Sequence, residues 1–138
     1  MTTTDTDRGA APAELALAVP ADAAALPDVR VTLDRWLTGL GVGTGTRQDV
    51  VLVVDEALTN AIEHAYGDNP HPDPISLTAV HDASGVEVRV RDRGTWKPPT
   101  VDGVRGRGLA MIATIADRMD LSVADGHTTV FAHVPHRD

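Results

Sequence analysis

The chain has 138 residues, 42% of them hydrophobic, which suffices for one domain with a real core and is too short for two. Its formal net charge of −8 argues against nucleic acid as the main partner, and the absence of cysteine excludes disulfides, thiolate metal sites and cysteine nucleophiles. No apolar run approaches the roughly 20 residues of a membrane span, and the N-terminus lacks the basic and apolar regions of a signal peptide. We therefore expect a cytoplasmic protein that binds neither a membrane nor, directly, nucleic acid.

The N-terminal part of the chain is predicted to form a strand and a helix behind a short tail. Residues 1–12 are small and polar with nothing to bury, so we predict a disordered tail, followed by a single domain over residues 13–138. Residues 14–19 are predicted to form a short strand. Apolar side chains recur at helical spacing within residues 22–40, which predicts a helix. Pro27 indicates that the regular part of this helix begins near that residue.

A glycine-rich linker at residues 41–46 is similar at first sight to a phosphate-binding loop. It lacks the GK[ST] ending that supplies the lysine and the magnesium-binding hydroxyl of such loops, so we interpret it as a connection between helices, with Thr46 as the helix N-cap. The next stretch, DVVLVVDEALTNAIEHAY at 49–66, is apolar over most of its circumference, which predicts a mostly buried helix.

This helix carries one narrow polar stripe. Glu56, Asn60 and Glu63 are spaced at i, i+4 and i+7 and therefore share one face. Burying a carboxylate and an amide costs free energy unless each finds a partner, so the stripe is expected to face other polar groups, water, a metal or a ligand. The alternative is that it faces solvent, and the helical period alone does not decide between the two.

The rest of the chain is predicted to contain two strand hairpins separated by a loop and a helix. Between residues 86 and 92 valines alternate with charged residues, which is typical of a sheet with one buried face. The predicted segments are an irregular proline-rich stretch at 67–74, strands at 75–81 and 86–92 joined by a turn at 82–85, a loop at 93–105, a helix at 109–119, and strands at 120–124 and 128–134 joined by Asp125-Gly126. This order predicts an α+β fold, a two-layer sandwich of a mostly antiparallel mixed sheet with helices on one face.

Three polar features lie on a predicted helix, at the end of a predicted strand and at the start of a second predicted helix. They are the Glu56/Asn60 stripe, Asp92-Arg93-Gly94 at the end of a strand, and Gly106-Arg107-Gly108-Leu109 at the start of a helix. Taken singly, an Asp-x-Gly sequence at the end of a strand is more often a simple turn, and a Gly-x-Gly sequence before a helix is commonly only a tight turn into that helix. Their order and separation within one small α+β domain are much less common, so a coincidental combination in a plain α+β domain is the least favoured interpretation.

These segments resemble the motifs of the ATP-binding domain of the GHKL superfamily, which includes gyrase, Hsp90, histidine kinases and MutL. Residues 56–64 match the N-box, residues 92–94 the first glycine box and residues 106–109 the second. From about residue 14 to its end, the chain is similar to the free-standing anti-sigma-factor serine/threonine kinases, the RsbW/SpoIIAB-like group. The resemblance implies the Bergerat fold, with ATP and Mg²⁺ as cofactors.

The resemblance implies a role for each polar residue, and the chemistry of each side chain suits that role. Asn60 would give its amide oxygen to Mg²⁺, which takes most of its other ligands from water and phosphate. Glu56 would be the catalytic general base that accepts a proton from the attacking hydroxyl. Asp92 would accept a hydrogen bond from the adenine amino group, a contact that guanine does not offer because it has a carbonyl there.

The glycine boxes are implied to bring the backbone close to the nucleotide. Gly94 would let the chain pass beneath the base. Gly106 and Gly108, followed by Leu109, would let backbone N–H groups and the helix N-terminus approach the phosphates. A basic side chain that neutralises the γ-phosphate is also implied, and the sequence does not choose among its three candidates, Arg105, Arg107 and Lys97.

Two positions depart from the family pattern. Trp96 stands where the first box often has a second glycine, and Ala110 stands where the second box often has a third. Neither change removes a ligand, so we expect nucleotide binding to survive, with a differently shaped lid formed by residues 93–105. We expect no catalytic role for Trp96, and we favour a structural over a catalytic role for His64.

The function implied by the resemblance is that of an anti-sigma regulatory factor with ATP-dependent serine/threonine protein kinase activity. Such a protein would hold a sigma factor inactive, phosphorylate an anti-anti-sigma partner with a STAS domain, and form a homodimer. The alternative is a non-catalytic module of the same fold that binds ATP and sequesters a partner. No motif marks the partner-binding surfaces, and only Arg30 and Arg35 of the first helix are candidates for a sigma-factor contact.

Overall fold

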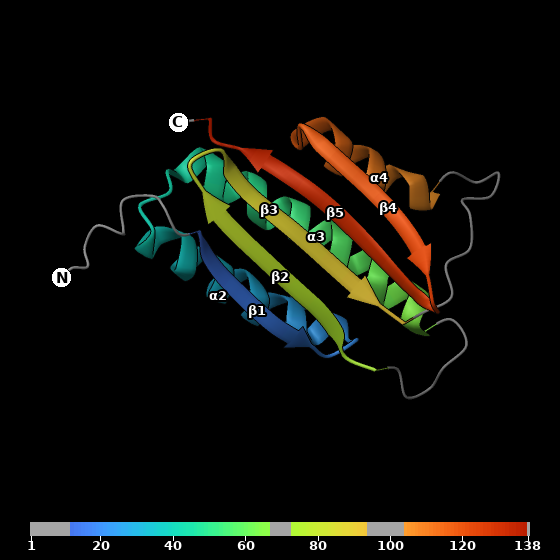
Figure 1. The fold of residues 1–138 in the computed structure, drawn as a ribbon. Coiled ribbons are helices and arrows are strands. Elements are labelled where there is room, and N and C mark those ends of the chain that lie inside the picture. Colours follow the sequence, from blue (N-terminus) through green and yellow to red (C-terminus); the bar gives the residue numbers. More distant parts are fainter. Residues whose placement is uncertain (1–11, 67–72, 94–103, 138) are drawn as a thin grey trace.

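The computed structural model describes residues 12–66, 73–93 and 104–137, which form five strands, three α-helices and one short 3-10 helix (Figure 1). In chain order the elements are β1 (Ala13–Val19), the 3-10 helix η1 (Ala23–Ala25), α2 (Leu26–Gly39), α3 (Thr44–Tyr66), β2 (Ile75–Asp82), β3 (Gly85–Asp92), α4 (Val104–Ile115), β4 (Arg118–Ala124) and β5 (His127–Pro135). Apart from Pro12, the predicted tail at 1–12 lies outside the described residues. No helix in these described segments is long and apolar enough to cross a membrane.

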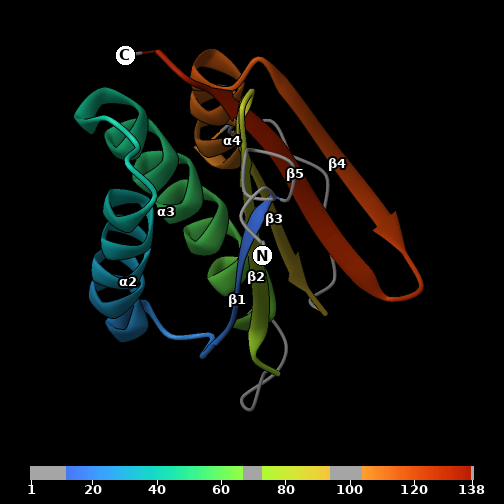
Figure 2. The same ribbon diagram turned by 60° about the vertical axis from the view of Figure 1, so that its left-hand side comes forward.

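The five strands form one sheet in the order β1-β2-β3-β5-β4, and each neighbouring pair is antiparallel. The three α-helices lie on the same face of this sheet, and no described helix covers the other face (Figure 2). The predicted α+β class, with a sheet covered by helices on one face, is therefore confirmed.

The core lies between the sheet and α3, the helix predicted to be mostly buried. Val53 and Leu58 of α3 are at most 1% exposed, and they belong to one core cluster with Leu33 of α2, Leu77 of β2 and Val88 of β3. Complete burial of such a side chain contributes about 1.5–3 kcal/mol relative to leaving it in water. The apolar surface of α3 thus fixes this helix against the centre of the sheet.

The start of α3 differs from the prediction that Thr46 is its N-cap. The helix begins at Thr44, because the N–H of Arg47 already donates to the carbonyl oxygen of Gly43 at 3.0 Å. Thr46 is fully buried, and its hydroxyl accepts a hydrogen bond from the backbone N–H of Arg137 at 3.0 Å. Its side chain therefore joins the C-terminal segment to α3 instead of capping a helix.

The position of α4 also corrects the sequence prediction. The helix was expected at 109–119, but it spans Val104–Ile115, and β4 already begins at Arg118. The chain leaves the helix at Ala116, and the N–H of Asp117 donates to the carbonyl oxygen of His133 at 2.9 Å, which starts pairing with β5. The glycine box at 106–108 therefore lies within the first turns of α4, not before the helix.

A polar cluster around His133 joins three parts of the fold. His133 Nδ1 lies 2.7 Å from Asp117 Oδ1 at the junction of α4 and β4, and His133 Nε2 lies 3.0 Å from Ser84 Oγ in the β2–β3 turn. Ser84 also donates its hydroxyl to Asp82 Oδ1 at 2.6 Å. The hydrogen bond from His133 holds the pKa of Asp117 below its ordinary value, and that from the Ser84 hydroxyl lowers the pKa of Asp82.

We expect this cluster to make stability depend on pH in the acid range. A carboxyl whose pKa is lower in the folded state adds stability above its ordinary pKa of about 3.9, and this stability is lost as the pH falls through the lowered value. Asp117→Asn is therefore expected to lower the melting temperature at pH 7, with a deficit that shrinks as the pH falls below about 4.

Thermal unfolding of both proteins between pH 7 and pH 2.5 checks this. Asp120→Asn is the matched control, because Asp120 is exposed on β4 and has no ion pair among the described residues. If the melting temperature of Asp117→Asn is lower than that of the wild type by the same amount over the whole pH range, the expected link between the lowered pKa of Asp117 and stability is contradicted.

Candidate functional site

The polar stripe on α3 is not uniformly exposed to solvent. Glu56 is partly buried, Asn60 is only 6% exposed, and Glu63 is exposed. The side-chain nitrogen Nδ2 of Asn60 has no hydrogen-bond partner among the described residues. A buried amide without a partner costs free energy, so this end of the side chain is suited to a ligand. Because the amide can turn by half a rotation, it can present either N–H groups or its oxygen there.

A second buried polar pair lies where β3 and β5 run side by side. Asp92 is the last residue of β3 and 4% exposed, and its cross-strand partner is Thr128 of β5, which is 2% exposed. Thr128 Oγ1 has no hydrogen-bond partner among the described residues. The C-terminal ends of α3 and β3 lie at the same end of the molecule (Figures 1 and 2). The pair and Asn60 are thus buried polar groups at one end of the layer between sheet and helices.

The sequence analysis did not name Thr128 as a site residue, although the signal was present. Val130, Ala132 and Val134 follow it at a spacing of two and are buried, so Thr128 occupies an inward-facing position of the same strand. A hydroxyl in a row of buried apolar side chains needs a partner. The two-residue period of β5 could therefore have added Thr128 to the candidates.

The remaining predicted site residues divide between α4 and segments that are not described. Gly94, Trp96 and Lys97 lie outside the described residues, as does most of the predicted lid at 93–105. The backbone of Arg105, Gly106, Arg107, Gly108 and Leu109 lies within α4, which packs against α3. The second glycine box therefore lies on the helix that packs against α3, and α3 carries Glu56 and Asn60.

The start of α4 determines which backbone groups are available for a ligand. In a helix that begins at Val104 the N–H groups of residues 104–106 have no partner within the helix. Gly106 is one of these three residues, whereas the N–H of Gly108 belongs to the next turn. The first turn of α4 therefore has the free donors and the positive end of the helix dipole that suit an anion.

Comparison with known proteins identifies the family. Residues 19–133 match the model of the family described as histidine kinase-like ATPase domain. The chain belongs to this family. The GHKL resemblance of the sequence is thereby confirmed, and membership of an ATPase family implies that this histidine kinase-like ATPase domain binds ATP.

Two solved structures are similar to this histidine kinase-like ATPase domain. One is the crystal structure of the RsbU and RsbW domains of Rv1364c from Mycobacterium tuberculosis, with 27% sequence identity and a TM-score of 0.71 over 91% of this chain. The chain spans 33% of the length of that protein, which is therefore much larger. The other is the SiaB-SiaC complex from Pseudomonas aeruginosa, with 16% identity and a TM-score of 0.68 over 87% of this chain and 88% of that one. The second likeness shows the fold alone.

The chemistry of the described residues fits a nucleotide. Nδ2 of Asn60 and the hydroxyl of Thr128 are buried groups without a partner among the described residues, and a bound ligand would satisfy them. In the described part of the chain, no group of three or more His, Cys, Asp or Glu side chains could hold a metal ion by itself. A Mg²⁺ ion in this histidine kinase-like ATPase domain would therefore depend on phosphate and water for most of its ligands.

Proposed function

We propose that this protein is an anti-sigma regulatory factor with ATP-dependent serine/threonine protein kinase activity. It would sequester a sigma factor, phosphorylate an anti-anti-sigma partner with a STAS domain, and act as a cytoplasmic homodimer. The observation that carries the proposal is the buried Asn60, whose Nδ2 has no partner among the described residues and which lies one helical turn after Glu56 in an ATPase domain. The likeness to a structure containing an RsbW domain supports the anti-sigma assignment.

In this proposal Asp92 and Thr128 hold the adenine. The Asp92 carboxylate accepts a hydrogen bond from the adenine amino group, and the Thr128 hydroxyl on the neighbouring strand can donate to a ring nitrogen or a bound water. Both side chains are almost fully buried, and guanine would set a carbonyl oxygen, which cannot donate, against the Asp92 carboxylate. The pair therefore selects ATP over GTP, and Gly94 is proposed to let the backbone pass beneath the base.

The phosphates are assigned to the first turns of α4 and to Asn60. Free N–H groups at the start of α4, including that of Gly106, donate to phosphate oxygens, and the rest of the box, Gly108 and Leu109, keeps the helix close. Asn60 supplies one oxygen to Mg²⁺, which would neutralise the phosphates. The cation opposite the γ-phosphate is one of three side chains: Arg105, Arg107 and Lys97.

Glu56 is proposed as the general base for transfer. Its carboxylate accepts the proton of a partner Ser or Thr hydroxyl while that oxygen forms a bond to the γ-phosphorus and the bond to the ADP oxygen breaks. Glu56 is partly buried on α3, so it is held by the helix and still reachable by a hydroxyl. Most of the rate acceleration then comes from positioning and from charge stabilisation.

Incubation of the protein with γ-labelled ATP, Mg²⁺ and purified STAS-domain proteins from the same cell tests the function. We expect one of these proteins to become labelled on serine or threonine, in an amount that approaches one phosphate per molecule. Binding of ATP without labelling of any STAS protein would contradict the kinase and favour the non-catalytic module that sequesters a partner.

A further inference from the structure

The face of the sheet that no described helix covers carries a continuous polar row. Ser76 of β2 pairs with Arg91 of β3, Arg91 pairs with Thr129 of β5, and Thr129 pairs with Ser122 of β4. Strands in a sheet lie about 4.8 Å apart, so neighbours in this row are close enough to contact one ligand. Side chains alternate along β3, and Arg91 therefore points away from the side on which Asp92 is buried.

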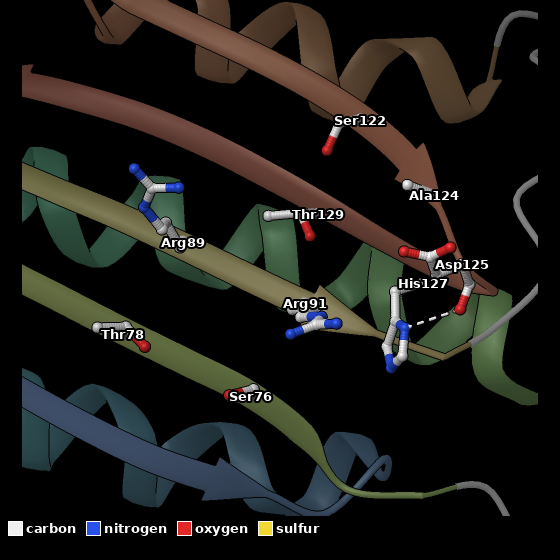
Figure 3. Close-up of a pocket in the computed structure, with 9 residues that line it drawn as sticks. All are labelled: Ser76, Thr78, Arg89, Arg91, Ser122, Ala124, Asp125, His127 and Thr129. Atoms are coloured by element: carbon white, nitrogen blue, oxygen red, sulfur yellow. Dashed lines mark hydrogen bonds between the residues drawn. The ribbon is translucent and has the colours of Figure 1, made fainter.

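A hollow of about 340 Å³ lies over this row, and we call it the sheet-face pocket. Most of its lining consists of short side chains, and Figure 3 shows the longer side chain of Arg91 between Ser76 and Thr129. A water molecule occupies about 30 Å³ in the liquid, so the pocket has room for a phosphate group and for part of the molecule that carries it. The lining residues are Ser76, Thr78, Arg89, Arg91, Ser122, Ala124, Asp125, His127 and Thr129.

The arginines in and beside the pocket differ in whether they form an ion pair. Three arginines alternate along the sequence at 89, 91 and 93. Arg89 is held by Glu87 at 3.0 Å and stacks 5.0 Å from the centre of the Phe131 ring, and Arg93 contacts Asp73 at 3.3 Å. Arg91 has no ion pair among the described residues.

The rim of the pocket adds one acid and one imidazole. His127 Nδ1 lies 3.1 Å from the backbone oxygen of Asp125, which can only accept, so Nδ1 carries the proton of this hydrogen bond. The Asp125 carboxylate is the acidic group in the lining, against the two guanidinium groups of Arg89 and Arg91. Because Glu87 already pairs with Arg89, the guanidinium in this lining that remains available to an anion is that of Arg91.

We propose that the sheet-face pocket binds the phosphate group of a small molecule at a site separate from the nucleotide site. The Arg91 guanidinium can donate two parallel hydrogen bonds to phosphate oxygens. The hydroxyls of Ser76, Thr129 and Ser122 lie on both sides of it and can donate to the remaining oxygens. A tetrahedral phosphate suits this arrangement better than a planar carboxylate, because its oxygens spread in more directions than the two of a carboxylate.

Nuclear magnetic resonance with uniformly ¹⁵N-labelled protein and pyrophosphate or orthophosphate as probes tests the proposal. We expect saturable shifts at the amides of Ser76, Arg91 and Thr129 in the absence of Mg²⁺ and nucleotide. Arg91→Gln is expected to weaken pyrophosphate binding by roughly 10-fold or more, because a hydrogen bond to a charged group contributes about 1.5–3 kcal/mol. The expected shifts are those of residues on the sheet face that no described helix covers. The result is therefore independent of whether the protein transfers phosphate from ATP.

Arg93→Gln is the matched control, since it removes the same charge two residues further along the chain, just beyond the end of β3, from an arginine that does not line the pocket. We expect it to change the affinity less than about threefold, because Arg93 is outside the lining and its charge is already paired with Asp73. Thr129→Val is a second variant that keeps every charge and should also weaken binding. Equal losses in the two arginine variants, shifts that do not saturate, or shifts confined to other surfaces would overturn the proposal.

Discussion

Glu56→Gln is expected to reduce phosphate transfer to the STAS-domain partner by about 10²–10⁴-fold, the usual contribution of a general base. The amide has nearly the same size and shape as the carboxylate, but it cannot accept the proton of the attacking hydroxyl. Glu56 lies one turn before Asn60 on the rigid helix α3, so the substitution should not disturb the neighbouring groups that hold the nucleotide. Affinity for Mg–ATP should therefore stay within about threefold of the wild-type value.

Single-turnover transfer from γ-labelled ATP measures this effect separately from nucleotide binding. Glu63→Gln is the matched control, because Glu63 lies seven residues later on the same face of α3 and its side chain is exposed. Wild-type transfer rates in Glu56→Gln would remove Glu56 from the role of base. Equal losses in both variants would indicate that the charge of α3, and not a specific proton acceptor, matters.

Gly85→Ala is expected to destabilise the protein by roughly 2–4 kcal/mol, a large part of the 5–15 kcal/mol typical of a domain. Gly85 has a φ of +146°, in a region that residues with a side chain rarely adopt. A Cβ there would overlap the carbonyl oxygen of Val134 and lie 2.9 Å from Cα of Pro135. These atoms belong to the backbone of β5, so the central strands β3 and β5 would have to separate.

Urea denaturation of Gly85→Ala and of Gly39→Ala checks this effect. Gly39 is the last residue of α2, and a Cβ there meets no described atom within 4 Å. Alanine has the higher helix propensity, so Gly39→Ala should be neutral or stabilising by up to about 1 kcal/mol. A loss below about 0.5 kcal/mol in Gly85→Ala would contradict the close approach of the two strands.

Much of the fold was predictable because its periodic patterns are strong. The alternating valines of β3 and the continuous apolar surface of α3 predicted both elements, and the structure buries the valines of β3 and most of the apolar side chains of α3, with Leu52 exposed. The ends of elements were harder, since they depend on contacts that are distant in sequence. Thr46 looks like a cap in the local sequence, but its hydroxyl accepts from Arg137, which is 91 residues away. The start of β4 at Arg118 similarly depends on pairing with β5.

The sequence predicted residues of the candidate site only where they belong to a family motif. Spacing on one helix placed Glu56 and Asn60 on a common face, and the structure leaves Nδ2 of Asn60 buried without a partner among the described residues. Thr128 has no motif of its own, and only its pairing with Asp92 across two strands marks it. Arg91 was one of three alternating arginines in the sequence, and its difference from the other two appears only when their ion pairs are known.

Calorimetric titration tests most directly the proposal that Asp92 and its neighbours bind the adenine of ATP. Mg–ATP and Mg–GTP are titrated into the wild-type protein and into Asp92→Asn, with Asp120→Asn as a surface control. We predict that wild type and Asp120→Asn bind ATP and discriminate against GTP, and that Asp92→Asn loses roughly 10–100-fold in ATP affinity because a buried, charge-assisted hydrogen bond is removed. Equal binding of ATP and GTP by the wild-type protein, or unchanged ATP affinity in Asp92→Asn, would contradict the account.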